Sequence, residues 1–249
     1  MSVALRTEGL SRNWGALQAV REVSFALEAG ARHALIGPNG AGKTTFINLL
    51  TGVLRPSGGD VFLGEQKITK LPPDLRVKRG MTRTFQINTL FPGLTVLESV
   101  VLAICEREGL GAAWRPVARC TRQIAEARQT LDELHLGSEI NTLTRSLPYG
   151  KQRLLEIAVA LATRPRILLL DEPAAGIPAD ESAEIFSVLS QLPRDVTVLF
   201  IEHDMRLVFR FAERITVLVD GAILVQGAPQ QIADDPRVRE VYLGEAQHG

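Results

Sequence analysis

The residues with the clearest chemical pattern are Gly37, Gly42, Lys43 and Thr44, which match the spacing GxxxxGK[ST] within GPNGAGKT. Glycines at these positions let backbone N–H groups wrap around phosphates, while the lysine adds positive charge and the hydroxyl reaches a magnesium ion. A random chain of this length would contain the pattern roughly once in a hundred times. The strand-like HALIG before the loop and the helix-like KTTFINLLTGVL after it make coincidence a weaker explanation, and no third glycine follows at the spacing of a dinucleotide fingerprint. We therefore predict a phosphate-binding loop made of Gly37, Pro38, Asn39, Gly40, Ala41, Gly42, Lys43, Thr44 and Thr45.

Two adjacent carboxylates, Asp171 and Glu172, end the apolar run ILLLDE, which reads as a buried strand. A nucleotide bound with magnesium needs a carboxylate at the end of a strand near its phosphate loop. The same pattern also arises where a buried strand simply ends in a solvated acidic turn. Because a phosphate-binding loop precedes it in the chain, we predict that Asp171 binds magnesium and that Glu172 is a general base for the attacking water.

With these motifs the chain resembles the ABC transporter ATPase family over nearly its whole length. The resemblance implies ATP and Mg²⁺ as cofactors and ATP hydrolysis as the reaction. Gln86, in RTFQ, matches the Q-loop glutamine that senses magnesium, and His203, in LFIEHDM, matches the switch histidine that contacts the γ-phosphate. Trp14, in NWGALQAV, falls where the family has an aromatic ring stacked on adenine. The alternatives are an exposed glutamine, a structural histidine and a partly buried loop tryptophan.

The family's signature motif, usually LSGGQ, corresponds to Leu147, Pro148, Tyr149, Gly150 and Lys151 in this chain. In the family this segment opens a helix that faces the γ-phosphate of ATP held by the opposite subunit. Proline is tolerated in the first turn of a helix, so Pro148 keeps the positive end of the helix dipole but removes a serine hydroxyl. Lys151 places a cation where the family has a neutral glutamine. Because LPYGK departs from the family's pattern at these two positions, we hypothesise that, in a heterodimer, the site that it serves hydrolyses ATP at a different rate from the other site.

Patterns of strands and helices alternate around these motifs. ALRTEGL, VSFAL, HALIG, RILLLDE and TVLFIEH read as strands, while KTTFINLLTGVL and ESAEIFSVLSQL read as helices. The alternation predicts an α/β fold with a parallel-sheet core. RCTRQIAEARQTLDEL and QRLLEIAVALA read as helices in a region with few strand signals. Asp220–Gly221, between two β-branched runs, predicts a hairpin that closes the α/β part.

The resemblance implies one ABC ATPase domain over residues 1–249, of the P-loop NTPase fold. Its RecA-like parallel-sheet core and N-terminal antiparallel β subdomain are expected in residues 1–87 and 166–230. A helical signature subdomain is expected in residues 88–165, and a C-terminal extension in residues 231–249.

Composition is that of an ordinary folded protein with a sizeable core, since 45% of the 249 residues are hydrophobic. The 28 basic residues balance the 28 acidic ones, so net charge does not favour nucleic acid or an anionic membrane surface. Cys105 and Cys120 fit neither a CxxC pair nor a disulfide framework, which favours a reducing compartment. The N-terminal residues show no secretory signal, and the apolar runs are too short to cross a bilayer. We expect any membrane role to come through a partner.

Within the family, DEPAAGIP, EHDM and VYLGEA resemble the LivG-like branch of branched-chain amino acid importers. This implies a peripheral protein on the cytoplasmic face of the inner (plasma) membrane. The implied partners are a second, LivF-like ATPase or another copy of the chain in a head-to-tail dimer, two membrane permease subunits and, indirectly, a periplasmic solute-binding protein. No nucleic acid partner is expected. Amides, urea and aromatic acids stay open as solutes beside leucine-type substrates, because the other proteins select the cargo.

Two other functions stay open. The chain could serve lipopolysaccharide export, or be a soluble ABC protein in translation or DNA repair, although those usually carry two cassettes or long inserted arms. It could also be a nucleotide-binding subunit with weak hydrolysis, which LPYGK permits and the intact Glu172 and His203 disfavour. The importer ATPase is the function that we favour.

Overall fold

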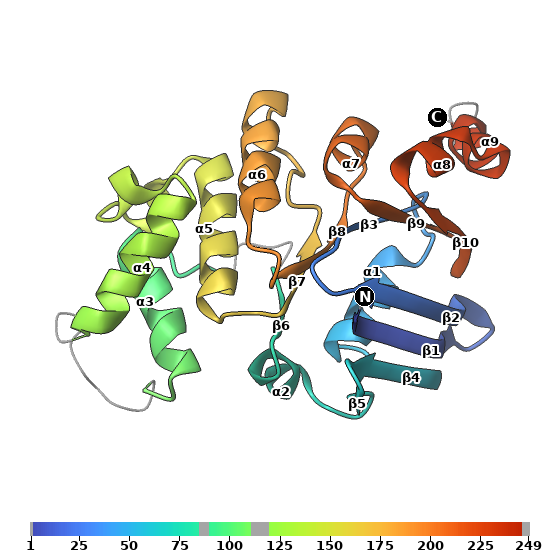
Figure 1. Cartoon of the computed structure of the whole chain (residues 1–249), viewed down its shortest axis with the longest axis horizontal. Helices are drawn as coiled ribbons and strands as arrows, with labels where there is room; N and C mark the ends of the chain where they lie inside the picture. The colour runs from blue at the N-terminus through green and yellow to red at the C-terminus, as the bar shows by residue number, and fades with distance from the viewer. Residues whose placement is uncertain (1, 85–89, 111–119, 246–249) are drawn as a thin grey trace.

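Two sheets and a set of flanking helices make up the computed structural model, which describes residues 2–84, 90–110 and 120–245 (Figure 1). The larger sheet has six strands, in the order β10 (Ala222–Gly227), β9 (Arg214–Val219), β3 (Arg32–Ile36), β8 (Thr197–Ile201), β7 (Ile167–Asp171) and β6 (Met81–Arg83). The smaller sheet has four, in the order β2 (Leu17–Glu28), β1 (Val3–Trp14), β4 (Gly58–Leu63) and β5 (Gln66–Lys67). β6, β7, β8, β3 and β9 run parallel, whereas the smaller sheet is antiparallel. The predicted α/β class with a parallel-sheet core is confirmed.

The helices of the described residues follow the strands along the chain as expected for a fold of this class. They are α1 (Lys43–Thr51), α2 (Pro73–Lys78), α3 (Val96–Arg107), α4 (Thr121–Glu133), α5 (Tyr149–Ala162), α6 (Ala179–Gln191), α7 (Met205–Phe211), α8 (Pro229–Asp234) and α9 (Pro236–Glu245), with 3₁₀ turns η2 (Gly137–Glu139) and η3 (Thr144–Ser146). α3, α4 and α5 lie between β6 and β7 in sequence and are grouped at one end of the molecule in Figure 1. The division of the chain into subdomains stays a prediction.

The parallel sheet is the middle layer, because its strands are buried on both faces. β3, β7 and β8 are buried at every residue. In β7, Leu168 and Leu170 pack into a core with α3 to α7, whereas Ile167 and Leu169 pack into a second core with α1 and the antiparallel sheet. Successive side chains of a strand point to opposite faces, so one apolar run serves both cores.

The hairpin predicted from Asp220–Gly221 joins β9 to β10. Val219 is paired with Ala222 in antiparallel register, and the two residues between them have φ angles of 47° and 77°. Two consecutive positive φ values are what a two-residue hairpin of the favoured twist requires. The hairpin prediction is confirmed, and the turn lies against the phosphate-binding loop, since the Gly221 amide donates to the Ala41 carbonyl at 3.0 Å.

No helix within the described ranges is both long and apolar enough to cross a membrane. The two cysteines, Cys105 and Cys120, are free.

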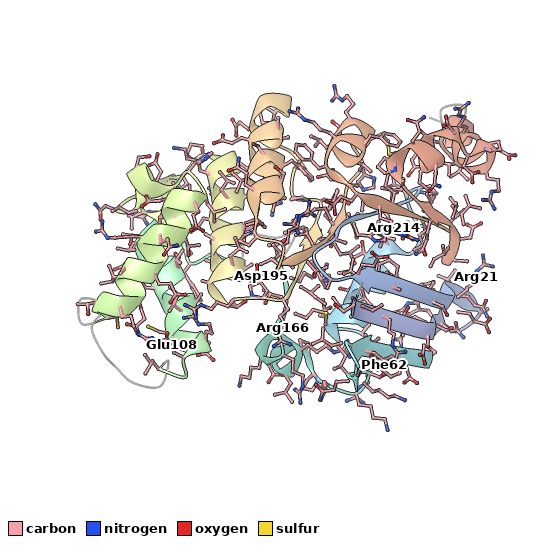
Figure 2. The ribbon with its side chains drawn as sticks, viewed as in Figure 1. Arg21, Phe62, Glu108, Arg166, Asp195 and Arg214 are labelled. Atoms are coloured by element: carbon pink, nitrogen blue, oxygen red, sulfur yellow. The ribbon has the colours of Figure 1, made fainter. Side chains whose placement is uncertain are left out.

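His33, on β3, is a buried titratable group that lies away from the predicted site residues. Its side chain is 1% exposed, packs edge-on to Phe25 at 5.1 Å, and shares a 2.7 Å hydrogen bond between Nε2 and the Thr216 hydroxyl. Burial, reinforced by the charge of Arg214 (Figure 2), lowers the pKa of His33 to about 3. The imidazole is therefore neutral in the folded protein at neutral pH.

We expect His33 to make the fold sensitive to mild acid. An unfolded histidine has a pKa of about 6.5, so between pH 6.5 and 3 the unfolded chain binds the extra proton. The contribution of neutral His33 to the free energy of unfolding is therefore present above pH 6.5 and declines as the pH falls. At pH 5.5 it is smaller by about 1.4 kcal/mol. His33→Gln, which does not titrate, should lose that much less free energy of unfolding than the unaltered protein between pH 7.5 and 5.5, measured by urea denaturation. Equal losses in both proteins would contradict the assignment.

Candidate nucleotide site

The predicted site residues are brought together by the carboxyl ends of three neighbouring parallel strands. Ile201 at the end of β8 is in register with Asp171 at the end of β7 and with Leu35 near the end of β3. The loops that leave these strands therefore start at one edge of the sheet, where ligands bind in open α/β folds. Gly37, Glu172 and His203 lie on those three loops.

The phosphate-binding loop needs glycine at two positions because other backbone atoms approach it closely. A Cβ on Gly37 (φ 153°) would lie 2.0 Å from the Leu218 carbonyl oxygen, and a Cβ on Gly42 (φ 96°) would lie 2.3 Å from that of Ala19. Gly42 also caps α1 without a side-chain hydrogen bond, so the first-turn amides of this helix are not capped by a side chain. Uncapped amides at a helix N-terminus favour an anion. Pro38, Asn39, Gly40 and Ala41 complete the turn, and Lys43, Thr44 and Thr45 form the first turn of α1.

Lys43 folds back over the loop that precedes it. Its Nζ donates to the carbonyl oxygens of Gly37 at 2.6 Å and Pro38 at 2.9 Å, and the residue is buried. The ammonium group is thus held at the mouth of the loop, where it can exchange carbonyl oxygens for phosphate oxygens. Thr44, one residue further, is exposed at the same turn.

Only one of the two carboxylate oxygens of Asp171 has a hydrogen-bond partner among the described residues. Its Oδ2 accepts from Arg83 Nη2 at 2.5 Å, and the second Arg83 nitrogen, Nη1, donates to Asn48 Oδ1 at 2.5 Å. The Asp171 side chain is 1% exposed, and its Oδ1 has no hydrogen-bond partner among the described residues. A buried carboxylate oxygen without a partner is costly and fits a site for a cation.

A magnesium ion at Asp171 would need ligands from the nucleotide. Among the described residues, no three histidine, cysteine, aspartate or glutamate side chains gather in a way that could hold a metal. Magnesium is often bound through one or two protein oxygens together with phosphates and water. The donors present, Asp171 and the Thr44 hydroxyl, fit that mode; the predicted third contributor, Gln86, lies outside the described residues.

Glu172 and His203 meet across the gap between two loops. His203 Nε2 lies 2.8 Å from Glu172 Oε1. An ionised carboxylate can only accept, so Nε2 carries the proton in this pair. Glu172 has a φ of 50°, a left-handed conformation that is uncommon outside glycine and typical of functional loops.

Trp14 ends β1 with one ring face covered. The Arg12 guanidinium carbon lies 3.9 Å from the Trp14 ring centroid, and Arg12 Nη1 donates to the Arg55 carbonyl at 2.9 Å. The Trp14 residue is 49% exposed. Ala19, in the next strand, abuts Gly42, so the β1–β2 hairpin adjoins the phosphate-binding loop. An adenine stacked on Trp14 would therefore complete a sandwich of cation, indole and base.

The LPYGK segment begins α5, with Pro148 at the cap position and Tyr149 as the first helical residue. Lys151 forms an ion pair with Glu139 in η2, so its charge is already shared within the chain. The Tyr149 hydroxyl accepts from Arg153 at 2.8 Å. Leu147 is buried in the helical core below the segment.

This segment also contacts α6 and the loop that precedes it. A Cβ on Gly150 would lie 2.2 Å from a Glu181 carboxylate oxygen, and one on Gly176 would lie 3.7 Å from the Tyr149 ring. None of the described hydrogen bonds joins LPYGK to the phosphate-binding loop. The structure thus brings residues 37–45, Asp171, Glu172 and His203 to one edge of the sheet and leaves residues 147–151 at the start of a separate helix.

Two contacts were not predicted from the sequence. Arg83, three residues before Gln86, pairs with Asp171, and Arg12, two residues before Trp14, covers the indole ring. Each has a usable signal, because a basic residue at the end of a strand beside an acidic strand end is placed to pair with it, and residues two apart share one face of a strand.

Known proteins resemble this chain over nearly its full length. A family model described as ABC transporter matches residues 20–175, and another, described as branched-chain amino acid ATP-binding cassette transporter, matches residues 222–248. The chain is 41% identical to the high-affinity branched-chain amino acid transport ATP-binding protein BraF of Pseudomonas aeruginosa, over 97% of this chain and 98% of that protein. It is 39% identical to the lipopolysaccharide export system ATP-binding protein LptB of Acidithiobacillus ferridurans, over 98% of each. The ADP conformation of an ATP-binding cassette of an ABC transporter superposes with a TM-score of 0.85 at 30% identity, covering 98% of this chain and 100% of that one.

Proposed function

This chain belongs to the ABC transporter family, and we propose that it is the ATP-hydrolysing motor subunit of an importer for branched-chain amino acids or related small solutes. The observation that carries the proposal is its end-to-end similarity to BraF, a branched-chain amino acid transport ATP-binding protein. The match of residues 222–248 to a family model for branched-chain amino acid cassettes supports the same cargo.

In the proposed reaction, water attacks the γ-phosphorus of ATP while the bond to the β-phosphate oxygen breaks. Lys43 and the loop amides hold the β- and γ-phosphates, which places the reacting group at the strand edge that carries Glu172. Glu172 takes the proton of the attacking water on its carboxylate, whose Oε1 is hydrogen-bonded to His203 Nε2. The products are ADP and inorganic phosphate.

Magnesium, when bound, neutralises the charge that develops between the β- and γ-phosphates. Asp171 and Thr44 would hold it, with help from Gln86. Arg83 keeps Asp171 in place through Oδ2, so Oδ1, which has no hydrogen-bond partner among the described residues, would be the oxygen available to the metal. Trp14 would stack on the adenine.

We propose that two such ATPase chains act together, head to tail. Within one chain, LPYGK and the phosphate-binding loop lie on separate elements, so a signature segment from a second chain would have to close over the γ-phosphate. The second chain would be a LivF-like ATPase or another copy of this one. Two membrane permease subunits would anchor the pair at the cytoplasmic face of the membrane, and a periplasmic solute-binding protein would deliver the cargo.

Lipopolysaccharide export is the second candidate, because LptB is 39% identical to this chain over 98% of each protein. The C-terminal match favours the importer, since it covers residues 222–248 and is described for branched-chain amino acid cassettes.

A reconstituted transport system distinguishes the two candidate functions. The chain is co-purified with the permease subunits and second ATPase of a branched-chain amino acid importer, placed in liposomes, and assayed for ATP hydrolysis and for uptake of radioactive leucine. We expect hydrolysis that rises when leucine-loaded binding protein is added, together with uptake that requires ATP. Failure to assemble or to respond, with assembly instead on a lipopolysaccharide export complex, would contradict the importer proposal.

The altered signature predicts a measurable difference between the two ATP sites of a heterodimer. Pro148→Ser combined with Lys151→Gln adds the hydroxyl of the family's motif and releases Glu139 from its ion pair. The added hydroxyl should speed turnover about tenfold, the effect of one hydrogen bond to a charged group. Phosphate release from the assembled transporter measures it. Lys151→Gln alone releases Glu139 without adding the hydroxyl and serves as the matched control. Kinetics unchanged by the double substitution would rule out a distinct contribution from LPYGK.

A further inference from the structure

Glu202 is a buried carboxylate that lies between the two loops carrying Glu172 and His203. It follows the last residue of β8 and is 5% exposed. Its Oε1 accepts from the Ala174 amide at 3.0 Å, and its Oε2 accepts from the His203 amide at 2.9 Å. Each of its two oxygens thus holds the backbone of a different loop.

Together with the contact between the Glu172 and His203 side chains, these hydrogen bonds link the loop after β7 to the loop after β8. Ala174 is two residues after Glu172, and His203 is the next residue after Glu202. The side chains of Glu172 and His203 meet at 2.8 Å, and the Glu172 amide donates to the Ile201 carbonyl at 3.1 Å. The distance between the two side chains therefore depends on the backbone spacing that the Glu202 carboxylate sets.

A carboxylate at this position is expensive for the fold. Burial raises the pKa of Glu202, while the hydrogen bonds from the Ala174, His203 and Asp204 amides oppose that rise. Among the ion pairs of the described residues none includes Glu202. A buried acid that is compensated mainly by amides at two loops is a costly arrangement for stability alone, and such costs concentrate where geometry matters for function.

We propose that Glu202 is a positioning residue for ATP hydrolysis, which sets the spacing between Glu172 and His203 by holding the amides of Ala174 and His203. The inference rests on the proposed function, because it assigns Glu202 a role in that reaction. Glu202 itself touches neither nucleotide nor water in this role. It acts through the pair.

Glu202→Gln keeps the size of the side chain and changes only its hydrogen bonds. Glutamine has one acceptor oxygen, so its NH₂ group must face one of the two amides and that hydrogen bond is lost. We expect kcat of the assembled transporter to fall about tenfold. The dissociation constant for ATP should change less than about twofold, because Glu202 acts on the amides of Ala174 and His203, which lie outside the phosphate-binding loop. Glu202→Asp, one methylene too short to reach both amides, should behave alike and replaces Glu202→Gln if that variant does not fold.

A matched control exists at the amino ends of the parallel strands, opposite the end that carries the site. Glu213 Oε2 accepts from the Arg32 amide at 3.1 Å, at the start of β3 and far along the strand from the site. Glu213→Gln makes the same chemical change to a carboxylate that holds a backbone amide. It should leave kcat unchanged.

A double-mutant cycle with His203→Ala is the decisive experiment. If Glu202 works through His203, Glu202→Gln should cost about tenfold in kcat in the unaltered background and less than about twofold in the His203→Ala background. In parallel, ¹H–¹⁵N spectra of the isolated chain should show the amides of Ala174 and His203 shifted by Glu202→Gln and not by Glu213→Gln. If Glu202→Gln lowers kcat by the same factor in both backgrounds, or if the amide resonances of Ala174 and His203 do not shift, the proposed role of Glu202 is wrong. No hydrolysis by the unaltered complex would instead contradict the proposed function and the positioning role with it.

Discussion

Glu172→Gln is expected to bind ATP normally and to lose hydrolysis by about a hundredfold or more, which is the range for removal of a general base. Glutamine keeps the shape of the side chain and can still form a hydrogen bond with His203, but its amide cannot take a proton from water. In the proposed site the loop at residues 37–45 holds the nucleotide, and the substitution changes none of these residues. Phosphate release by the assembled transporter and ATP binding by the isolated chain measure the two effects separately.

The control for Glu172→Gln is the same change at an exposed position. Glu184, on α6, lies near His135 with its side chain 51% exposed, so it offers another glutamate–histidine contact far from the strand edge. Glu184→Gln should leave turnover unchanged. Near-normal turnover in Glu172→Gln would exclude Glu172 as the base and would leave water activation to another group.

The fold could be predicted because its strands are short apolar runs with strong end signals. ILLLD and TVLFI are buried at every residue, as continuous apolar runs predict, and Asp220–Gly221 makes the hairpin that its residue types favour. The helix predicted over residues 119–134 is observed as Thr121–Glu133, and that over residues 152–162 begins earlier, at Tyr149. The earlier start follows from Pro148, which fits a helix cap better than a helix interior.

The positions of the site residues could be predicted where the chemistry is local in sequence. The phosphate-binding loop is a single turn of chain, and its glycine spacing reports backbone conformations that other residues rarely adopt. Contacts between distant segments are signalled only indirectly, by the residue types at the strand ends. Arg83 and Asp171 are 88 residues apart, and Ala174 and Glu202 are 28 apart, so both contacts depend on how the strands are ordered in the sheet.

The same reasoning explains why Lys151 differs from its sequence-based interpretation. From the sequence, Lys151 is a cation added beside a phosphate. In the structure it is neutralised by Glu139, twelve residues earlier in the chain. The net charge that the segment offers to a partner's nucleotide is therefore smaller than the residue type suggests, which is why the paired substitution at 148 and 151 is tested against Lys151→Gln alone.

Lys43→Met should weaken ATP binding by about a hundredfold, which corresponds to about 3 kcal/mol for the loss of charged hydrogen bonds to phosphate. Methionine keeps the apolar stem that is buried in the loop, so the fold should survive. The two carbonyl oxygens that Nζ contacts, those of Gly37 and Pro38, lose a donor, but Pro38 still accepts from the Ala41 amide at 3.2 Å.

The measurement for Lys43→Met is the dissociation constant for ATP by calorimetry, with Tm followed in the same samples. Lys78→Met, on the exposed face of α2, removes the same charge elsewhere and should bind ATP like the unaltered chain. If Lys43→Met binds as tightly as Lys78→Met, the ammonium group does not hold phosphate, and the amides of residues 37–45 would have to supply the affinity alone. If it binds weakly while Tm is preserved, the loss comes from the charge at the mouth of the loop, since the cradle of glycines that positions it is still intact.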